Sequence, residues 1–144
     1  MQVKKRTTQK VCDRRSKCPI SAALEMFGDK WTLLIVRDMI LFGKSTFGEF
    51  QNSPEGIATN ILTDRLQRLE VAGMVEGSDD PENKRRTIYK LTTKGADLWP
   101  VLAQIIIWSA KHDSETVVSK ELLKSLERDP DGVLRKLQKS LAPS

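Results

Sequence analysis

The 144-residue sequence contains few of the side chains that carry out enzyme chemistry. It has one histidine, one tyrosine and two cysteines, and aromatic residues make up only 6% of the chain. The histidine, His112, falls at the predicted end of a helix, where a solvated side chain is expected. No GxSxG, HExxH, glycine-rich phosphate loop or spaced acidic cluster occurs in the sequence. We therefore expect a protein that is not an enzyme and that uses no metal and no cofactor.

The two cysteines, Cys12 and Cys18, form no recognisable redox or metal motif. Five residues separate them, whereas a redox pair has CxxC spacing and a zinc site needs further ligands. Reduced, inert thiols are the ordinary outcome. Cys18 also has a second interpretation, because it precedes Pro19 at a predicted helix start and follows a basic segment, and both surroundings favour the thiolate. Cys18 is therefore a candidate redox sensor.

Long apolar segments are also missing. No run of about 18 apolar residues occurs, so the sequence predicts no membrane-spanning helix and no membrane partner. The N-terminal residues MQVKKRTTQKVCDRRSK lack the apolar core of a signal peptide. We therefore expect a cytoplasmic protein, and the length suits one domain with a real core.

The net charge of +5 is concentrated in one segment. Residues 1–17 carry seven Lys/Arg and one Asp (+7 − 1 = +6), residues 18–112 carry 11 Lys/Arg and 12 Asp/Glu (11 − 12 = −1), and residues 113–144 carry six of each. The folded body is therefore not generally basic. Attraction to phosphate must come from the basic N-terminal arm, which is residues 1–17, or from the basic segment 84–90. A basic arm is often simply solvated.

The segment from Ile57 to Lys94 carries the strongest pattern. Apolar residues recur at helical spacing up to Gly73, which is a typical C-terminal helix cap. The period then changes to two in MVEGS and RTIYKLT, which are predicted strands on either side of a polar loop, DDPENK. A helix followed by a hairpin with a basic return strand is the layout of a winged helix that binds DNA. Small α+β domains that bind no nucleic acid share this pattern, so the pattern alone leaves both interpretations open.

The polar face of the predicted helix favours DNA binding. It carries short hydrogen-bonding side chains suited to base edges and phosphates, in place of the Glu and Lys expected on an inert surface helix. Arg65 falls beside the apolar stripe and is predicted to be a paired, partly buried arginine. The candidate DNA-binding residues are Thr59, Asn60, Thr63, Asp64, Gln67 and Arg68 in the helix and Lys84, Arg85 and Arg86 in the hairpin.

Helices are predicted on both sides of this segment. Pro19 begins a short apolar helix, Asp29 caps a helix over residues 30–41 with Phe42 in the core, and Thr46 caps FGEFQ after a short strand at residues 44–46. A helix over residues 94–111, bent at Pro100, is apolar on more than one face, which predicts a second subunit packed against it. The candidate dimerisation residues are Leu98, Leu102, Ile105, Ile106 and Trp108.

Four separated motifs resemble the HxlR-type transcriptional regulators, a winged-helix group related to the MarR regulators. They are CPISAALEMFGDKWTLLIVRDMILFGKSTFGEF, GIATNILTDRLQRLEVAGMV, IYKLTTKG and LWPVLAQIIIWSAKH. The resemblance implies a homodimer held together by its terminal helices that binds an inverted-repeat operator in double-stranded DNA. It also implies that Cys18 corresponds to the family's N-terminal cysteine, which in some members looks like a sensor of oxidants.

The expected architecture is α+β, mainly α: a winged helix-turn-helix with a two-stranded wing and flanking dimerisation helices. The expected division is the basic N-terminal arm (1–17), the winged-helix domain with its dimerisation helix (18–112) and a C-terminal helical extension (113–144). The expected function is that of a sequence-specific, homodimeric transcriptional regulator, modulated by thiol oxidation or a small-molecule effector. The alternative is a winged-helix protein-interaction module without sequence-specific DNA binding.

Overall fold

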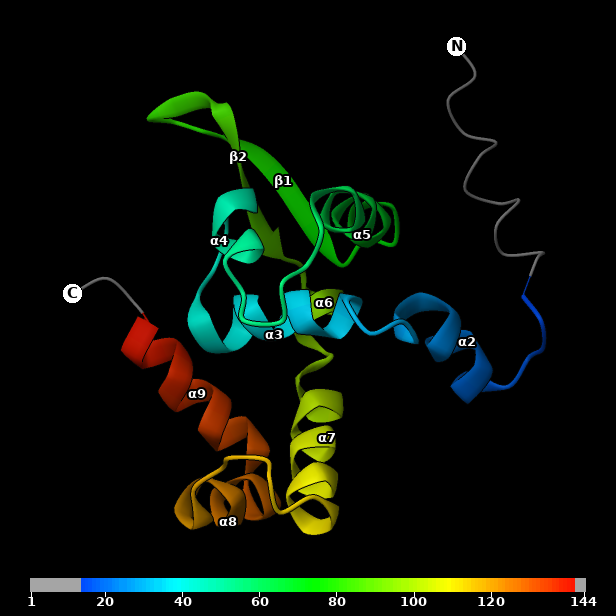
Figure 1. Ribbon diagram of the computed structural model, residues 1–144, viewed down its shortest axis with the longest axis vertical. Coiled ribbons are helices and arrows are strands. Elements are labelled where there is room, and N and C mark those ends of the chain that lie inside the picture. The colour runs from blue at the N-terminus through cyan, green and yellow to red at the C-terminus, as the bar shows by residue number, and fades with distance from the viewer. Residues whose placement is uncertain (1–13, 142–144) are drawn as a thin grey trace.

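The computed structural model of the chain describes residues 14–141. In this part the chain forms eight helices and two strands: α2 (Pro19–Phe27), α3 (Thr32–Phe42), α4 (Phe47–Gln51), α5 (Thr59–Val71), β1 (Val75–Asp80), β2 (Asn83–Leu91), α6 (Thr93–Ala96), α7 (Trp99–His112), α8 (Lys120–Arg128) and α9 (Pro130–Leu141). The hairpin, α4 and α5 lie at one end of the molecule and α7 and α8 at the other, while α2 extends to one side (Figure 1). The mainly helical α+β architecture with a two-stranded sheet is the one that the sequence predicts.

The core is built on one face of α5. Leu62, Leu66 and Leu69 recur at helical spacing, and all three side chains are buried together with Phe50 of α4 and Val36 of α3. Ala58, four residues before Leu62 at the same helical spacing, does not join this stripe, because it is the exposed N-cap residue of α5. The opposite face of α5 is left for solvent or a ligand.

Helices α4 and α5 are joined by a short turn and form a helix-turn-helix. The hydroxyl of Thr46 accepts a hydrogen bond from the backbone amide of Glu49 and donates one to the Glu49 carboxylate at 3.0 Å. Thr46 and Glu49 therefore stabilise the start of α4 together. At the far end of α5, Gly73 has a φ of 75°, a left-handed conformation that glycine adopts without strain. The predicted caps at both positions are confirmed.

The predicted extent of the polar loop DDPENK is wrong, because four of its six residues belong to the strands. Strand β1 runs to Asp80 and β2 starts at Asn83, with Pro81 and Glu82 left in the turn. The strands pair antiparallel from Val75 opposite Leu91 to Asp79 opposite Thr87. Residues 44–46, predicted as a short strand, pair with the hairpin through a single bridge between Thr46 and Ile88. The backbone amide of Tyr89 donates to the carbonyl of Ser45 at 2.7 Å.

The predicted helix over residues 94–111 is in fact two helices. Thr92 caps α6, which lasts four residues, and α7 starts at Trp99 with Pro100 in its first turn. Proline has no amide hydrogen to donate, and the first turn is the place where a helix does not need one. Pro100 therefore marks a new start where the sequence predicts a bend.

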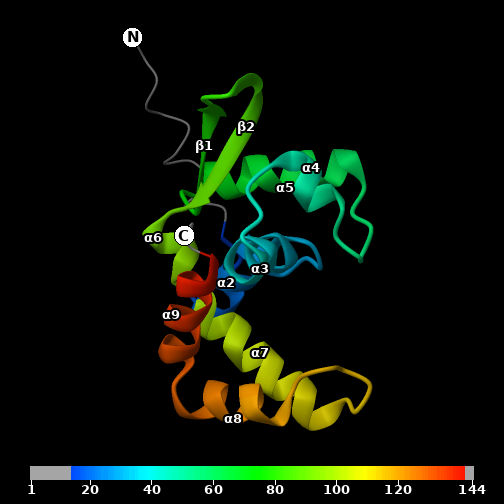
Figure 2. The ribbon, with the colours of Figure 1, turned by 90° about the vertical axis from the view of Figure 1, so that its left-hand side faces the viewer.

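The C-terminal helices α8 and α9 fold back onto α7 and α3 (Figure 2). Leu126 of α8 and Val133 of α9 are buried in the same core cluster as Trp99 of α7. The indole Nε1 of Trp99 donates to the carbonyl of Pro130 at 2.7 Å, which joins the start of α7 to the start of α9.

Two apolar segments are more exposed than their composition suggests, and one predicted core assignment is corrected. The first helix, α2, has no buried residue, and Ile20 is 71% exposed. Phe42, predicted in the core, is 57% exposed, and its ring lies 5.8 Å from both the Arg37 guanidinium and the Lys44 ammonium. A cation over an aromatic face is attractive, so the ring is held at the surface by those two charges.

Candidate nucleic-acid interface

The polar face of α5 lies free of the core and next to the hairpin. Thr59, Asn60, Thr63, Gln67 and Arg68 are exposed, and Asp64 is partly exposed. Helix α5 runs beside the base of the two strands, which extend past it to the tip of the hairpin (Figure 2). An α-helix fits the major groove of B-DNA, and a hairpin beside it is placed to contact the neighbouring backbone.

Two threonines of this face are held by short-range hydrogen bonds. The amide of Gln51, the last residue of α4, donates to the hydroxyl of Thr59 at 2.8 Å, and Thr63 donates to the carbonyl of Thr59 at 2.9 Å. Gln51 is not among the site residues predicted from the sequence. Its position at the end of a capped helix, just before the turn, is the one signal that singles it out.

Charged residues on α5 form a continuous series of ion pairs. The Arg65 Nε donates to Asp29 at 2.8 Å, another Arg65 nitrogen contacts the Asp64 carboxylate, and the Nε of Arg68 lies 3.0 Å from the same carboxylate. The prediction that Arg65 is a paired, partly buried arginine is confirmed. Asp64 is thus already engaged by two arginines, and its main effect at this surface is to orient Arg68.

Asp29 pairs with Arg65 and also accepts hydrogen bonds from the residues at the start of α3. Its carboxylate accepts hydrogen bonds from the backbone amides of Trp31 and Thr32 and from the Thr32 hydroxyl. Burial acts to raise the pKa of Asp29, but the hydrogen bonds from Thr32, Arg65 and Trp31 outweigh it and bring the pKa down to about 2. This carboxylate fixes the position of α5 relative to α3.

The three candidate DNA-binding residues of the wing, Lys84, Arg85 and Arg86, are not equivalent. Lys84 and Arg85 are exposed, whereas the Arg86 Nε donates to Asp80 at 2.7 Å. The Asp80 side chain is 6% exposed, and its pKa is lowered by the backbone amide of Glu82 first and by Arg86 second. Arg86 therefore neutralises a buried carboxylate at the hairpin turn, and Lys84, Arg85 and Lys90 carry the available positive charge of β2.

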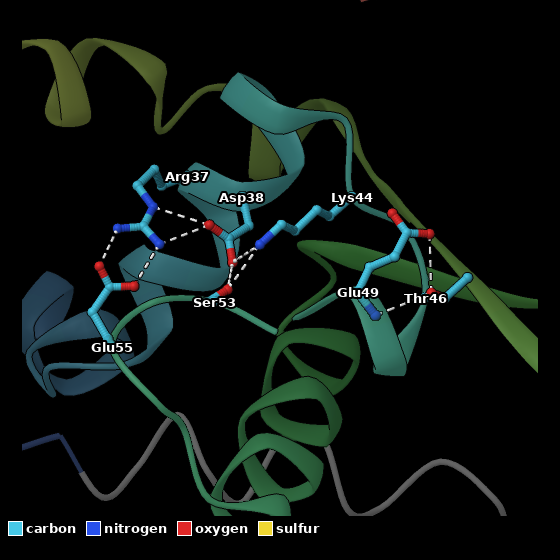
Figure 3. A network of polar contacts seen from close by, with 7 residues as sticks. All are labelled: Arg37, Asp38, Lys44, Thr46, Glu49, Ser53 and Glu55. Carbon is cyan, nitrogen blue, oxygen red and sulfur yellow. Dashed lines mark hydrogen bonds and ion pairs between the residues drawn. The ribbon is translucent and has the colours of Figure 1, made fainter. Parts of the chain in front are cut away.

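A second polar cluster joins α3 to the turn before α5 (Figure 3). Asp38, which is 2% exposed, contacts Arg37, Lys44 and Ser53, and Arg37 makes two hydrogen bonds of 2.8 Å to Glu55. Hydrogen bonding to Glu55 raises the pKa of Arg37, although burial opposes this, and Arg37 lowers the pKa of Glu55. The cluster holds the helix-turn-helix turn on α3, and the sequence pattern did not reveal it.

The candidate dimerisation residues of α7 fall into two groups. Ile105 and Trp108 are 44% and 65% exposed, whereas Leu98 and Ile106 pack against the core of the same chain. Leu102 is buried in that core. Its predicted role in a subunit contact is therefore corrected, because the side chain packs inside its own chain. Cys18 is exposed at the N-cap of α2, and Cys12 lies outside the described residues, as do residues 1–13 of the basic N-terminal arm.

Between residues 14 and 141, no three His, Cys, Asp or Glu side chains come together in a way that could hold a metal ion. Across the same residues, no helix has the length and apolar character needed to cross a membrane.

Comparison with known proteins identifies the fold and its use. The sequence profile described as HxlR-like helix-turn-helix matches residues 26–117, which is more than half of the chain. The chain belongs to the HxlR-like family. Relatives matched by sequence are named HTH-type transcriptional regulators, and this chain carries the same HxlR-like helix-turn-helix.

Individual relatives agree with this assignment. The regulator YodB from Bacillus subtilis is 30% identical over 107 residues, 72% of this chain and 95% of YodB, and the structure of its reduced form has a TM-score of 0.55. The redox regulator HypR, solved in its oxidized form, is 30% identical with a TM-score of 0.58 over 70% of this chain and 100% of HypR.

A candidate transcription factor, PA1607, is 36% identical with a TM-score of 0.65 over 73% of this chain and 74% of that chain. The alignments span only 62% and 58% of the length of two other curated relatives. The HxlR-like match stops at residue 117, so α8 and α9 lie beyond it.

Proposed function

We propose that this HxlR-like protein binds an inverted-repeat operator as a homodimer, with one α5 in each of two successive major grooves. The observation that carries the proposal is the shared position of the exposed polar face of α5 and the exposed Lys84 and Arg85 of the wing. In a symmetric dimer the two recognition helices would be about 34 Å apart, one helical turn of DNA.

Exposed apolar side chains support the dimer. Ile105 and Trp108 on α7 and Ile20 and Leu24 on α2 expose large apolar surface, although each helix belongs to an otherwise well-packed chain. Apolar patches of this kind on a soluble domain mark interaction surfaces. A two-fold symmetric contact uses the same patch on both copies, and we infer that α2 and α7 supply this patch.

The dimer is tested with the double variant Ile105→Ser/Trp108→Ser and the control Val117→Ser, which changes an exposed apolar residue in a loop. Light scattering gives the mass, and fluorescence anisotropy gives the affinity for an inverted repeat and for one half-site. We expect the double variant to be monomeric and to lose affinity for the inverted repeat alone. A double variant that stays dimeric would remove α7 from the interface.

We also propose that oxidation of Cys18 modulates DNA binding. The thiol is exposed at the start of α2, on the surface assigned to the dimer, and the relative HypR is a redox regulator. Two Cys18 thiols of a dimer would lose two electrons and two protons to an oxidant such as diamide and form one intersubunit disulfide. Non-reducing electrophoresis of the wild type and Cys18→Ser after diamide treatment tests this. A covalent dimer that persists in Cys18→Ser would exclude the residue.

A further inference from the structure

An apolar groove of about 370 Å³ lies between α9, the end of α3 and the base of the wing. Its walls include Met39 and Gly43 at the end of α3, Leu91 at the end of β2, and Leu134, Gln138 and Leu141 of α9. In Figure 1 the C-terminal end of α9 lies beside the end of α3, in agreement with the contacts between these two helices. A separate hollow between α3 and the turn before α5 measures only about 10 Å³, room for one water at most.

The size and lining of the groove indicate what it can bind. Pockets for small molecules measure roughly 300–1,000 Å³ and are mainly apolar with a few polar groups. None of the described side chains that line this groove carries a charge, and Gln138 alone has a polar side chain. An ion would lose its hydration there without gaining a partner. The volume lies at the lower end of the range for such pockets, so the space suits a small uncharged molecule.

The walls of the groove continue into the wing. Gly43 has a φ of 64°, and a Cβ added to it would lie 3.4 Å from a Leu141 methyl group, so α9 approaches the backbone of this turn closely. Two residues later, the carbonyl of Ser45 accepts the 2.7 Å hydrogen bond from Tyr89 of β2. Leu91, two residues beyond Tyr89, both lines the groove and pairs with Val75 of β1. A molecule in the groove would therefore contact Gly43 and Leu91, each two residues from a partner in the hydrogen bond that joins Ser45 to β2.

We propose that this groove binds a small, uncharged, mainly apolar effector, and that its occupancy changes the affinity of the wing and α5 for DNA. The regulatory half of the proposal rests on the proposed function, whereas the binding half does not. The residues contributed by α9 lie beyond the HxlR-like match at 26–117, so one wall of the site comes from the segment that follows the match.

Binding is tested with the uncharged fluorophore N-phenyl-1-naphthylamine, which brightens in apolar surroundings, titrated into the full chain. Gln138→Trp fills the groove from an exposed position, and Lys139→Trp is the matched control, one residue along the same helix and outside the groove lining. We expect Gln138→Trp to weaken probe binding at least about tenfold, a loss of about 1.4 kcal/mol, and the control to leave it unchanged. Equal binding by both variants would overturn the proposal.

A second variant and two further outcomes keep the assignment specific. Leu141→Asp places a charge at the groove from an exposed position and is expected to weaken binding as well. Loss of probe binding in Ile105→Ser/Trp108→Ser would assign the probe to the dimer surface and overturn the proposal. Probe binding that weakens as protein concentration rises would assign the groove to a second copy of the chain, with the same consequence.

The effector role is tested by linkage. If occupancy changes DNA affinity, then DNA must change probe affinity by the same factor, expected to be at least about fivefold. The measurement uses the promoter fragment upstream of the neighbouring divergent gene, with and without saturating probe. Equal DNA affinity in both conditions would overturn the regulatory half. A fragment that does not bind at all would count against the proposed function, while the probe titration would still decide the groove.

Discussion

The carboxylate of Asp64 illustrates how a side chain on the DNA-facing surface acts through its neighbours. Arg65 and Arg68 both contact it, so few of its lone pairs remain for a cytosine amino group. Gln67 lies one turn from Thr63 on the same exposed face and can offer both a donor and an acceptor to a base edge. We infer that Gln67 and Thr63 read bases, and that Asp64 orients Arg68.

Replacing Gln67 by alanine should change sequence preference. A bidentate contact between a side chain and a base contributes about 1–3 kcal/mol of discrimination, so Gln67→Ala should lose about that much at one operator position. Anisotropy titrations against single-base operator variants measure this loss of discrimination. The matched control is Gln104→Ala, at an exposed position of α7. Equal loss of affinity on every variant would show that Gln67 reads no base.

Asp29 predicts an acid-dependent stability. Its folded pKa of about 2 lies below the ordinary value of 3.8, so the ionised form stabilises the fold fully above pH 3.8, and this is lost as pH falls through about 2. The contribution is up to about 2 kcal/mol, and Asp29→Asn should remove it. Urea denaturation of the wild type, Asp29→Asn and the exposed control Glu115→Gln between pH 4 and 2 checks this. An identical pH slope for the wild type and Asp29→Asn would contradict it.

Among the elements, the wing has a division of labour that composition does not show. Its basic segment suggests a uniform phosphate-binding surface, yet Arg86 is committed to Asp80 at the turn. Removing one member of such a pair leaves a poorly solvated carboxylate beside the DNA backbone, whereas removing Arg85 takes away an exposed cation and little else.

Arg85→Ala and Arg86→Ala should therefore differ. The first is expected to shallow the plot of log affinity against log salt by about 0.9 and to leave the melting temperature unchanged, since one phosphate contact is lost. The second is expected to lower the melting temperature, because Asp80 loses its partner. Salt titrations between 50 and 200 mM, together with thermal denaturation, separate the two. Identical behaviour of both variants would contradict the assignment of Arg86 to Asp80.

In the whole molecule, the C-terminal extension is an integral part of the core and not an appendage. Leu126 and Val133 are buried with Trp99, and the Trp99 indole donates to Pro130 across 31 positions of sequence. The groove between α9 and the wing exists only because this extension folds back.

Replacing Trp99 by phenylalanine tests how strongly the extension is attached. The substitution keeps an aromatic ring but leaves the Pro130 carbonyl without its donor, which should cost about 1–3 kcal/mol of unfolding free energy. Urea denaturation measures it, with Trp108→Phe as the control because Trp108 is exposed. Equal stability of Trp99→Phe and the wild type would show that the hydrogen bond contributes nothing.

Much of this molecule follows from local patterns. The stripe of Leu62, Leu66 and Leu69 predicts α5 and its buried face, Thr46 predicts the cap of α4, and Gly73 predicts the end of α5, because each depends on residues within a few positions. The winged helix-turn-helix fold and the HxlR-like family follow from the same patterns in order. The paired state of Arg65 also follows, since its position beside the apolar stripe is a local property.

The remaining features depend on residues that are distant in sequence or on details that periodicity does not record. Asp80 and Arg86 meet because the hairpin turns at Pro81, and the Asp38 cluster joins residues up to 18 positions apart. Pro100 is compatible with a bend or with a new helix start, and the structure has a new start at Trp99. Leu102 is apolar in either setting, and only the packing of α7 against the core shows that its side chain belongs inside one chain. Apolar periodicity identifies which residues avoid water, but the partner that covers each of them is set by the three-dimensional arrangement of the helices.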